Sequence, residues 1–536
     1  MTSNRSHGAI IVSAIAALAL TPCIAAQQLL LELKGDNTPT LRWQDQFGIS
    51  CVGMPDIDGD GVDDLLVGAG RYNTKSTRVE GAAFVFSGMT GAQVRKHIGY
   101  SKFGKMGRAV DGGIDVDADD VPDYVVGESF GDRGINAAGI VHVYSGATGT
   151  ELWTFDGENS SDSLGESVAL IPDIDGDGHA EIVATAHSWD NLALGVGNCG
   201  RGYCWSGRAG TVLWTYDGTE NNQTMWWCTQ LNDVDGDGID DVAFGSTGIG
   251  AAGTGAGKVE LVSGASGSLI RTIVGAAAGD AFGLVRGCGD LDGDGIGDLI
   301  VGSMNANSDR GRIAAHSSAT GLELHAWDGT QKDQNLNVGA LRALRDWDGD
   351  GFADPLIGSS LATLDDCSGG WAQLRSGRTG RLLFEYRSRD DLGVGPTLGD
   401  SASTLGDLDG DGIPEIVVGA SAAGPLADQD GRLYVFAGDD LFLQADQSNY
   451  DLNDPITIEL RGGTQGVLGM IAITELDGAP LFVPLVIAAF DGNGELAITD
   501  TTDSTYLGHS LELAGWALPP SGRGKLIDSN VEWFRF

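Results

Sequence analysis

The sequence predicts an all-β protein, a seven-bladed β-propeller followed by a small C-terminal β-sandwich domain. Three observations support this. A nine-residue Asp-rich segment, DxDGDGxxD or a close relative, recurs seven times at intervals of 56 to 61 residues, the mark of a repeat architecture. Short apolar runs ending in Gly turns flank each copy, and no segment has the 3.6-residue period of a helix. Beyond residue 445 the repeat stops while β-type patterns continue.

Residues 1–26 are predicted to be a secretory signal peptide. Arg5 precedes an apolar run over residues 9–20, and the small residues Ala25 and Ala26 follow it. We therefore expect a secreted, extracellular or cell-envelope protein with no membrane span. A lipid anchor at Cys23 stays open, although the preceding Pro22 fits it poorly.

Residues 27–445 are predicted to form the propeller. Each unit has a first strand beginning "FG" or a relative, the acidic loop, a run such as "DLLVGAG" or "EIVVGAS", and two more strands joined by a Gly turn. A four-stranded sheet cannot bury both faces alone, but seven in a ring can. The opening segment "LLLELKG" (29–35) is like a fourth strand without a unit before it, so we expect it to complete the last sheet. The segment "LFLQ" (441–444) is the alternative for that role.

The net charge of −43 makes nucleic acid a poor partner and cations good ones. Ca²⁺ takes six to eight oxygen ligands. Four carboxylates at positions 1, 3, 5 and 9 of the loop converge if the backbone curls tightly, which Gly at positions 4 and 6 permits. Seven loops of this kind hold 28 of the 75 acidic residues.

The predicted cofactor is accordingly Ca²⁺, up to seven ions, held by the four acids of each loop and the backbone carbonyl at position 7. An EF-hand would need twelve positions and flanking helices, which this pattern lacks. The predicted ligands are Asp56, Asp58, Asp60, Val62 and Asp64; Asp115, Asp117, Asp119, Val121 and Asp123; Asp173, Asp175, Asp177, His179 and Glu181; Asp233, Asp235, Asp237, Ile239 and Asp241; Asp290, Asp292, Asp294, Ile296 and Asp298; Asp346, Asp348, Asp350, Phe352 and Asp354; and Asp407, Asp409, Asp411, Ile413 and Glu415.

The "FG" pair, the DxDGDGxxD loop and the "VGA" run together resemble the FG-GAP repeat family, which includes the propeller of integrin α-subunits and many bacterial secreted proteins. The resemblance covers about residues 29 to 440. Unit 2 departs from it, with Ala118 and Asp120 in place of Gly, and units 3 and 7 end in Glu. In the integrin relatives the rim opposite the calcium hairpins binds partners, so the resemblance implies the same rim here.

We therefore expect an exported calcium-binding propeller that acts as a binding or adhesion module for a protein or a glycan. The variable loops at that rim offer possible contact aromatics: Tyr72, Tyr100, Trp189, Trp226 and Trp227. The alternatives are a calcium-dependent polysaccharide lyase and a purely structural extracellular component.

No catalytic residue is nominated. A lyase needs a cluster of basic residues in the rim loops, and the candidates Lys75, Arg78 and Arg133 are scattered along the sequence. "GESFG" (127–131) matches a serine-hydrolase elbow in letters, but no helix follows it.

The sequence also gives expectations for four cysteines and for the C-terminal residues. Cys199 and Cys204 could form a disulfide in an oxidising compartment, and Cys51 and Cys228 are expected to be small buried strand residues. Residues 446–536 are predicted to be a β-sandwich, to which the sequence assigns no function.

Overall fold

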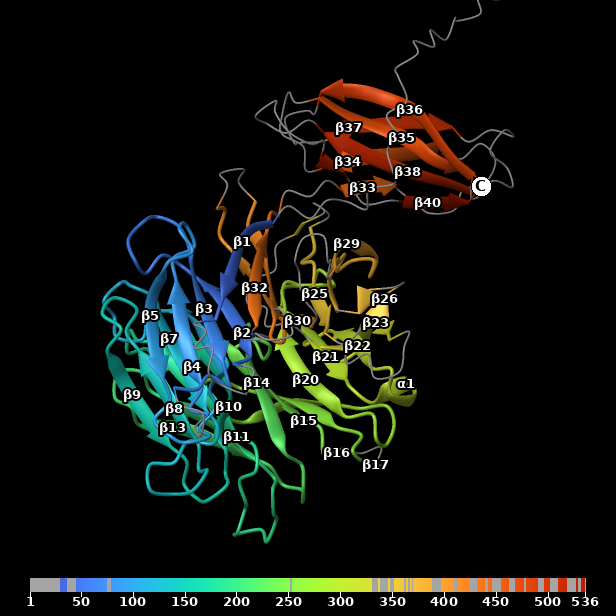
Figure 1. Cartoon of the computed structure of the whole chain (residues 1–536). Coiled ribbons are helices and arrows are strands. Elements are labelled where there is room, and N and C mark those ends of the chain that lie inside the picture. Colours follow the sequence, from blue (N-terminus) through green and yellow to red (C-terminus); the bar gives the residue numbers. More distant parts are fainter. Residues whose placement is uncertain are drawn as a thin grey trace, which may run out of the picture. The chain divides into compact units, whose positions relative to one another are not determined.

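The chain is all-β, with a seven-bladed β-propeller, in a computed structural model (Figure 1). The propeller belongs to a compact unit spanning Gln27–Phe442, and Leu443–Phe536 belongs to a second unit. The described residues are 29–35, 45–74, 79–250, 253–329, 336–337, 346–347, 351–360, 363–364, 367–368, 370–387, 397–408, 413–423, 431–438 and 442–445, and beyond these the strand backbone of 455–461, 468–476, 479–489, 496–501, 510–517, 527–528 and 532–535.

Blades 1 to 6 are antiparallel sheets whose four strands follow in chain order. Their strands are β2 (Phe47–Met54), β3 (Asp64–Ala69), β4 (Ala82–Phe86) and β5 (Gln93–Ile98); β6 (Met106–Ile114), β7 (Asp123–Glu128), β8 (Ile140–Tyr144) and β9 (Glu151–Asp156); β10 (Leu164–Ile171), β11 (Glu181–Ala186), β12 (Arg201–Trp205) and β13 (Val212–Asp217); β14 (Met225–Leu231), β15 (Asp241–Ser246), β18 (Lys258–Val262) and β19 (Leu269–Val274); β20 (Phe282–Gly287), β21 (Leu299–Ser303), β22 (Arg312–His316) and β23 (Glu323–Asp328); and β24 (Leu336–Asn337), β25 (Leu356–Ser359), β28 (Trp371–Arg375) and β29 (Leu382–Arg387).

Blade 7 closes the ring with a strand from the other end of the chain. Its sheet has the order β1-β32-β31-β30, from β1 (Leu29–Lys34), β32 (Arg432–Phe436), β31 (Glu415–Ala420) and β30 (Leu398–Leu405). The N-terminal strand thus completes the last sheet, as its sequence predicts. Its backbone pairs with β32 from Leu29↔Phe436 to Lys34↔Arg432.

The glycines of "FG" and "VGA" are the points at which neighbouring blades touch. A Cβ added at Gly68 of β3 would lie 1.9 Å from the carbonyl oxygen of Gly107. Gly107 follows Met106 at the start of β6 and takes the place that the "FG" glycine Gly48 has in β2. Gly419 of β31 meets the carbonyl of Gly48 in the same way at the closing joint, at 2.2 Å. The recurring letters are therefore explained by blade-to-blade contact, because a side chain at either glycine would hold the blades apart.

The joint between blades 3 and 4 departs from this rule. Thr185 takes the place of the "VGA" glycine and Trp226 that of the "FG" glycine, and the Thr185 hydroxyl lies 3.4 Å from the Trp226 carbonyl oxygen. Both members of the pair are replaced together, so this joint is built differently from the joints with two glycines.

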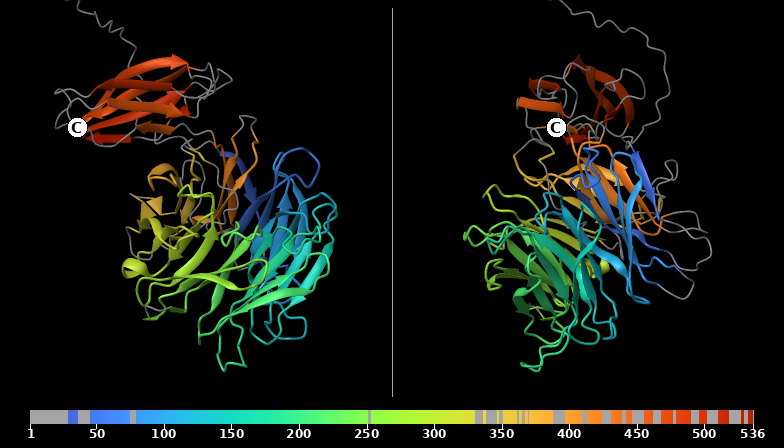
Figure 2. Two further views of the ribbon diagram at one scale, coloured as in Figure 1. Left: turned by 180° about the vertical axis from the view of Figure 1, so that it is seen from behind. Right: turned by 90° about the vertical axis from the view of Figure 1, so that its left-hand side faces the viewer.

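The hydrophobic core lies between blades, as expected for sheets that pack face to face around an axis. Tyr124 of blade 2 and Leu66 of blade 1 share one cluster, and Phe244 of blade 4 shares another with Val183 of blade 3. All four side chains are fully buried. Figure 2 shows the sheets arranged about the axis from two further directions.

The predicted Cys199–Cys204 disulfide is wrong. Cys199 precedes β12, and Gly200 between the two cysteines has φ of 81°. The two thiols lie in different core clusters, Cys199 between blades 2 and 3 and Cys204 between blades 3 and 4. Cys199 packs with Trp189 and Cys204 with Phe244, and both are buried free thiols. Cys51 and Cys228 are buried strand residues, as expected.

The described strands of the second unit form two antiparallel sheets. One has β33 (Phe442–Ala445), β34 (Pro455–Arg461) and β37 (Leu496–Thr501); the other has β36 (Ala479–Ala489), β35 (Leu468–Leu476), β38 (Ser510–Ala517), β39 (Ile527–Asp528) and β40 (Glu532–Arg535). The alternative closing strand "LFLQ" therefore contributes β33 to this unit, and not a strand to blade 7.

The remaining described strands form two short hairpins within the propeller unit. They are β16 (Ile249–Gly250) with β17 (Gly253–Thr254), and β26 (Thr363–Leu364) with β27 (Cys367–Ser368).

Helix is nearly absent from the described part of the chain. The segment α1 (Ala306–Asp309) is four residues long, and two of them have non-helical backbone angles. Within that part, nothing helical has the length and apolar character needed to cross a membrane.

Candidate functional site

The acidic loops all lie at one end of the blades, between the first and second strand of each sheet. Asp56–Asp64 joins β2 to β3, and the corresponding segments join the same two strands in the other blades. The turn between the third and fourth strands lies at this end too. We call this end the hairpin face and the opposite end the loop face.

The tight curl of these loops requires left-handed backbone at positions 4 and 6. Gly59 and Gly61 have φ of 86° and 89°, and the same pair of values recurs within a few degrees in blades 3, 4 and 5. An added Cβ at either residue would meet nothing within 4 Å. Glycine is therefore needed here for conformation and not for space.

Blade 2 adopts the same curl without glycine. Ala118 has φ of 61° and Asp120 has φ of 66°. Non-glycine residues pay for the left-handed conformation with about 1–2 kcal/mol each. The unit that departs from the sequence pattern therefore keeps the loop's shape at the expense of backbone strain.

The first acid of each loop organises the backbone. Asp56 accepts hydrogen bonds from the N–H groups of Asp58, Gly59 and Gly61 at 3.1, 2.7 and 2.7 Å. Burial alone would raise its pKa, but these backbone N–H donors outweigh burial and lower the pKa below the ordinary value. The carboxylate is therefore held in its charged form, as a cation ligand must be.

The last acid of each loop is buried in all seven blades. One of its oxygens accepts a hydrogen bond from the N–H at position 2, as Asp64 does from Ile57 at 2.9 Å. The other oxygen, in the Asp-ended loops, accepts one from the turn between the third and fourth strands, as Asp64 does from Gly88 at 3.1 Å. This residue therefore joins the acidic loop to the neighbouring hairpin.

Five loops bring three or four of the predicted acids together. In each group the ligand atoms lie within 4.8 Å of one another. The groups are Asp56, Asp58 and Asp64; Asp115, Asp117 and Asp123; Asp173, Asp175, Asp177 and Glu181; Asp233, Asp235 and Asp241; and Asp290, Asp292 and Asp294.

The remaining predicted ligands have other placements. Asp60, Asp119, Asp237 and Asp298 stand outside these groups, and Asp60 accepts a hydrogen bond from the Ser87 hydroxyl at 3.1 Å. The position-7 residues donate their N–H to the position-5 acid, as Val62 does to Asp60 at 3.0 Å. Asp348, Asp350, Asp409 and Asp411 lie outside the described residues.

The described parts of the last two loops follow the same hydrogen-bond plan. The N–H of Trp347 donates to Asp354 at 2.7 Å, and the N–H of Leu408 donates to Glu415 at 2.6 Å. In blade 6 the N–H of Gly351 also donates to the first acid, Asp346, at 2.7 Å.

Among the described loop residues, Oε1 of Glu181 and Oδ1 of Asp117 are buried carboxylate oxygens without a hydrogen-bond donor. Burial first, then the charges of Asp175 and the other loop acids, raises the pKa of Glu181 to about 8. A buried oxygen without a donor among other carboxylates is costly unless a cation or proton satisfies it. The donor set, hard oxygens on a tight loop, fits Ca²⁺.

The loop face holds some of the predicted contact aromatics and not others. Tyr100 is 60% exposed, and Trp226 and Trp227 are partly exposed. Trp189 and Tyr72 are buried instead. Their assignment as contact residues is wrong, because Trp189 packs in the core between blades 2 and 3 and Tyr72 in the core between blades 7 and 1.

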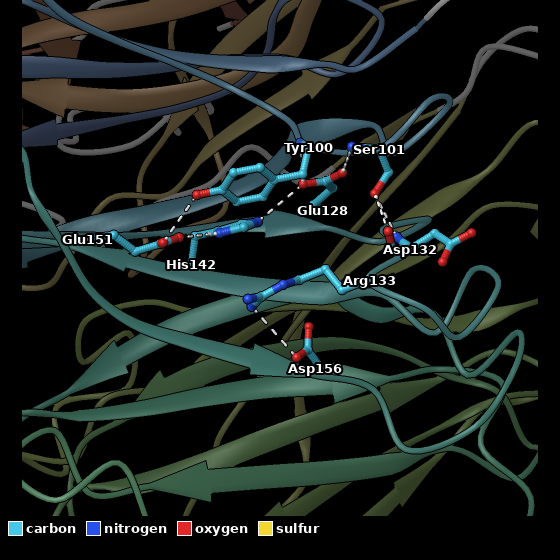
Figure 3. A network of polar contacts seen from close by, with 8 residues as sticks. All are labelled: Tyr100, Ser101, Glu128, Asp132, Arg133, His142, Glu151 and Asp156. Carbon is cyan, nitrogen blue, oxygen red and sulfur yellow. Dashed lines mark hydrogen bonds and ion pairs between the residues drawn. The ribbon is translucent and has the colours of Figure 1, made fainter.

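A buried polar network in blade 2 was not anticipated from the sequence (Figure 3). His142 of β8, fully buried, lies between two carboxylates, with Nδ1 2.7 Å from Glu151 and Nε2 3.2 Å from Glu128. Glu128 also accepts the backbone N–H groups of Tyr100 and Ser101, at 3.2 and 2.9 Å. The network therefore fixes the loop that carries the exposed Tyr100.

One residue of this network departs from the repeat pattern of the sequence. Glu128 ends the run "VVGE" where blades 1 and 7 have Ala69 and Ala420. Burial lowers the pKa of His142, but its hydrogen bonds to Glu128 and Glu151 outweigh burial and raise it. The hydrogen bond from His142 lowers the pKa of Glu151, so we assign an imidazolium held between carboxylates.

Of the three basic residues named for the enzyme alternative, Arg133 is the one that the structure describes. Arg133 lies 3.6 Å from Asp156 in an exposed ion pair, and Lys75 and Arg78 lie outside the described residues. The Tyr100 hydroxyl donates to Glu151 at 3.2 Å, and burial and that carboxylate raise the pKa of Tyr100. A raised pKa is the reverse of what a tyrosine base requires.

Comparison with known proteins points to one family. The FG-GAP repeat model matches residues 51–86 and 399–436, in blades 1 and 7, the two that meet at the closing joint. Integrin alpha-10 of Homo sapiens is 30% identical over 128 residues, 22% of this chain and 10% of that protein. Integrin alpha pat-2 of Caenorhabditis briggsae is 25% identical over 179 residues (30% and 14%), and integrin alpha-V of Gallus gallus 28% over 156 residues (28% and 14%).

The matches thus span about a tenth to a seventh of the length of these curated relatives. Among solved structures, a crystal structure of BBS1N in complex with ARL6DN is similar at a TM-score of 0.44 and 10% identity, over 77% of this chain and 97% of that one. Repeat matches in two blades, integrin relatives and seven four-stranded sheets agree with one another. The chain thus carries FG-GAP repeats in two blades of an integrin-α-like seven-bladed β-propeller.

Proposed function

We propose that this chain is an exported, calcium-binding propeller that acts as a binding or adhesion module. Its loop face would bind a protein or a glycan, and its hairpin face would hold up to seven Ca²⁺ ions. Residues 1–26 would be removed as a signal peptide, 27–445 would be the propeller and 446–536 a separate sandwich domain. The similarity to integrin alpha subunits supports a binding role.

The observation that carries the calcium proposal is the pair of buried, donor-free oxygens on Glu181 and Asp117. The acids of each loop would hold the ion, and bound calcium would supply the positive charge that lets several carboxylates stay ionised together. Loop order and metal binding would then be coupled. The ions would stiffen the hairpin face and take no part in a reaction.

Calcium titration of the full chain by calorimetry tests this proposal in blade 2. Asp117→Asn removes a predicted ligand, while Asp120→Asn removes the same charge from the same loop at a residue that is not a predicted ligand. We expect the first variant to lose one ion, or to bind it at least tenfold more weakly, and the second to keep it. Equal behaviour of the two variants, or no calcium uptake by the parent protein, would refute the site.

The binding role is tested by screening the calcium-loaded protein against glycans and candidate proteins. Retention of a partner after substitutions on the hairpin face, with loss after substitutions on the loop face, would support the proposal. Release of unsaturated sugars from a polysaccharide would instead establish the lyase alternative. A chain that binds nothing in these screens would leave the structural role.

A further inference from the structure

Four cationic or imidazole side chains gather on the loop face over blades 1 to 3, in a chain of strongly negative charge. They are Arg71, Lys105, Arg108 and His187. A Cβ added at Gly70, next to Arg71 in the chain, would lie 3.5 Å from Cα of Arg108. The charges of Arg71 and Arg108 both act on Lys105, and those of Arg108 and Lys105 act on His187.

Arg108 and Glu166 project from bulges in the first strands of blades 2 and 3. The pairing of β6 with β7 shifts between Met106 and Val110, and that of β10 with β11 shifts between Leu164 and Ser167. Bulges redirect side chains at the ends of strands. Nε of Arg108 forms an ion pair with Glu166, although 41% of the Arg108 side chain stays exposed.

Positive charge exceeds negative charge in this cluster. Glu166 is the carboxylate paired with Arg108, and Lys105 has its ammonium 4.0 Å over the ring of Phe130. Burial, and then the like charge of Arg108, lowers the pKa of Lys105, with Arg71 adding to the effect. Cations held near one another are stabilised by a bound anion.

An aromatic platform borders the cations on the blade 4 side. The rings of His187 and Trp226 stack with centroids 3.9 Å apart and planes 19° from parallel. His187 is buried, with 8% exposed, and its Nδ1 has no hydrogen-bond partner among the described residues. This platform stands at the joint where Thr185 and Trp226 replace the two glycines of the repeat.

We propose that this cluster, Arg71, Lys105 and Arg108 with the His187–Trp226 platform, binds a sugar carboxylate, that is, a uronic acid unit of an acidic glycan. The cations pair with the carboxylate, and the flat ring face of Trp226 packs against the sugar ring. Buried His187 stacks behind the Trp226 ring and holds its orientation. The inference rests on the proposed binding role of the loop face and names the chemical class of its ligand.

The probe is a trimer of galacturonic acid, titrated into the full chain by calorimetry at saturating calcium. A trimer is short, so calcium cross-linking of long polyuronate chains does not imitate binding. The methyl-esterified trimer tests the carboxylate, a sulfated disaccharide tests anions in general, and a short poly-aspartate peptide tests an acidic protein partner.

Lys105→Gln and Arg108→Gln are the variants, and Lys102→Gln, an exposed lysine in the same loop, is the matched control. Arg108→Gln leaves Glu166 unpaired, so Lys105→Gln, which breaks no ion pair, guards against a folding artefact. We expect the trimer's Kd to rise about tenfold in each variant, the loss of one charge-assisted contact. The control should bind as the parent does, and the esterified trimer should bind at least tenfold more weakly.

The inference fails if the parent does not bind the trimer, if the ester binds equally well, or if Lys102→Gln weakens binding as much as Lys105→Gln. Tighter binding of the sulfated disaccharide or of the aspartate peptide would also overturn it. In each of these cases the proposed binding role of the loop face stands if another partner binds the parent protein and no longer binds after substitutions on that face. The proposed binding role fails together with this inference only if no partner binds the loop face.

Discussion

Gly68→Ala tests the idea that the repeat's glycines are blade joints. The added Cβ would lie 1.9 Å from the Gly107 carbonyl oxygen, whereas ordinary contact begins near 3.4 Å. The two blades must therefore separate locally by the difference, about 1.5 Å. A radial gap of only 0.5–1 Å already forfeits a quarter to a half of each dispersion contact. Because both partners are backbone, we expect a loss of about 3–5 kcal/mol in the free energy of unfolding.

The assay is equilibrium denaturation of the calcium-loaded protein, followed by tryptophan fluorescence. Gly195→Ala is the control, because this residue has φ of 69° and open space around its Cβ position. Its loss of about 1–2 kcal/mol would be conformational alone. Gly68 has no such positive φ, so alanine suits its backbone. A smaller loss for Gly68→Ala than for Gly195→Ala would refute the joint.

Three further predictions concern blades 2 and 3. Ala118→Gly should raise the free energy of unfolding by about 1 kcal/mol by relieving left-handed strain, and Gly176→Ala should lower it by about as much; denaturation curves compare them. In the metal-free protein, with chelator present, the pKa of Glu181 is raised to about 8. The folded state therefore gains stability at low pH, where Glu181 is protonated, and loses it as the pH rises through that value. Melting temperatures of the metal-free protein should thus fall from about pH 5 to about pH 9, less steeply in Glu181→Gln; an unchanged slope in that variant contradicts the assignment. His142→Phe should lower the free energy of unfolding by about 3 kcal/mol, because it leaves Glu128 buried without its histidine partner. Adding Glu128→Ala should recover most of this loss. A double variant no more stable than His142→Phe alone would show that the Glu128–His142 pair is not the cause.

Much of the propeller could be predicted from the sequence because the same acidic loop, flanking strands and glycine turns recur seven times. The closing strand was predictable because residues 29–35 look like a fourth strand without a unit. The separation of Cys199 from Cys204 was not predictable, because their spacing does not show that the two thiols enter cores on opposite sides of blade 3. Trp189 and Tyr72 failed for a related reason: residues in a variable loop can still turn inward.

The acidic loops could be predicted from the sequence more fully than the rest of the site. In blades 1 to 4 the acids at positions 1, 3 and 9 converge as spacing predicts, because the left-handed conformations at positions 4 and 6 fix the curl. Asp60, at position 5, accepts a hydrogen bond from Ser87 in another turn and stands outside its group, which spacing within the loop does not encode. The Glu128–His142 network was visible only as one odd letter in "VVGE", because its partners come from three separate segments.

The seam between β1 and β32 also determines how the propeller would yield to force. Leu29, the first residue of its strand, pairs with Phe436, the last residue of the other. Tension applied between the two ends of this unit therefore pulls at the same end of an antiparallel pair. The bonds are loaded one at a time, as in a zipper and not in shear. The ring would open at this seam under modest load, before any blade loses its own sheet.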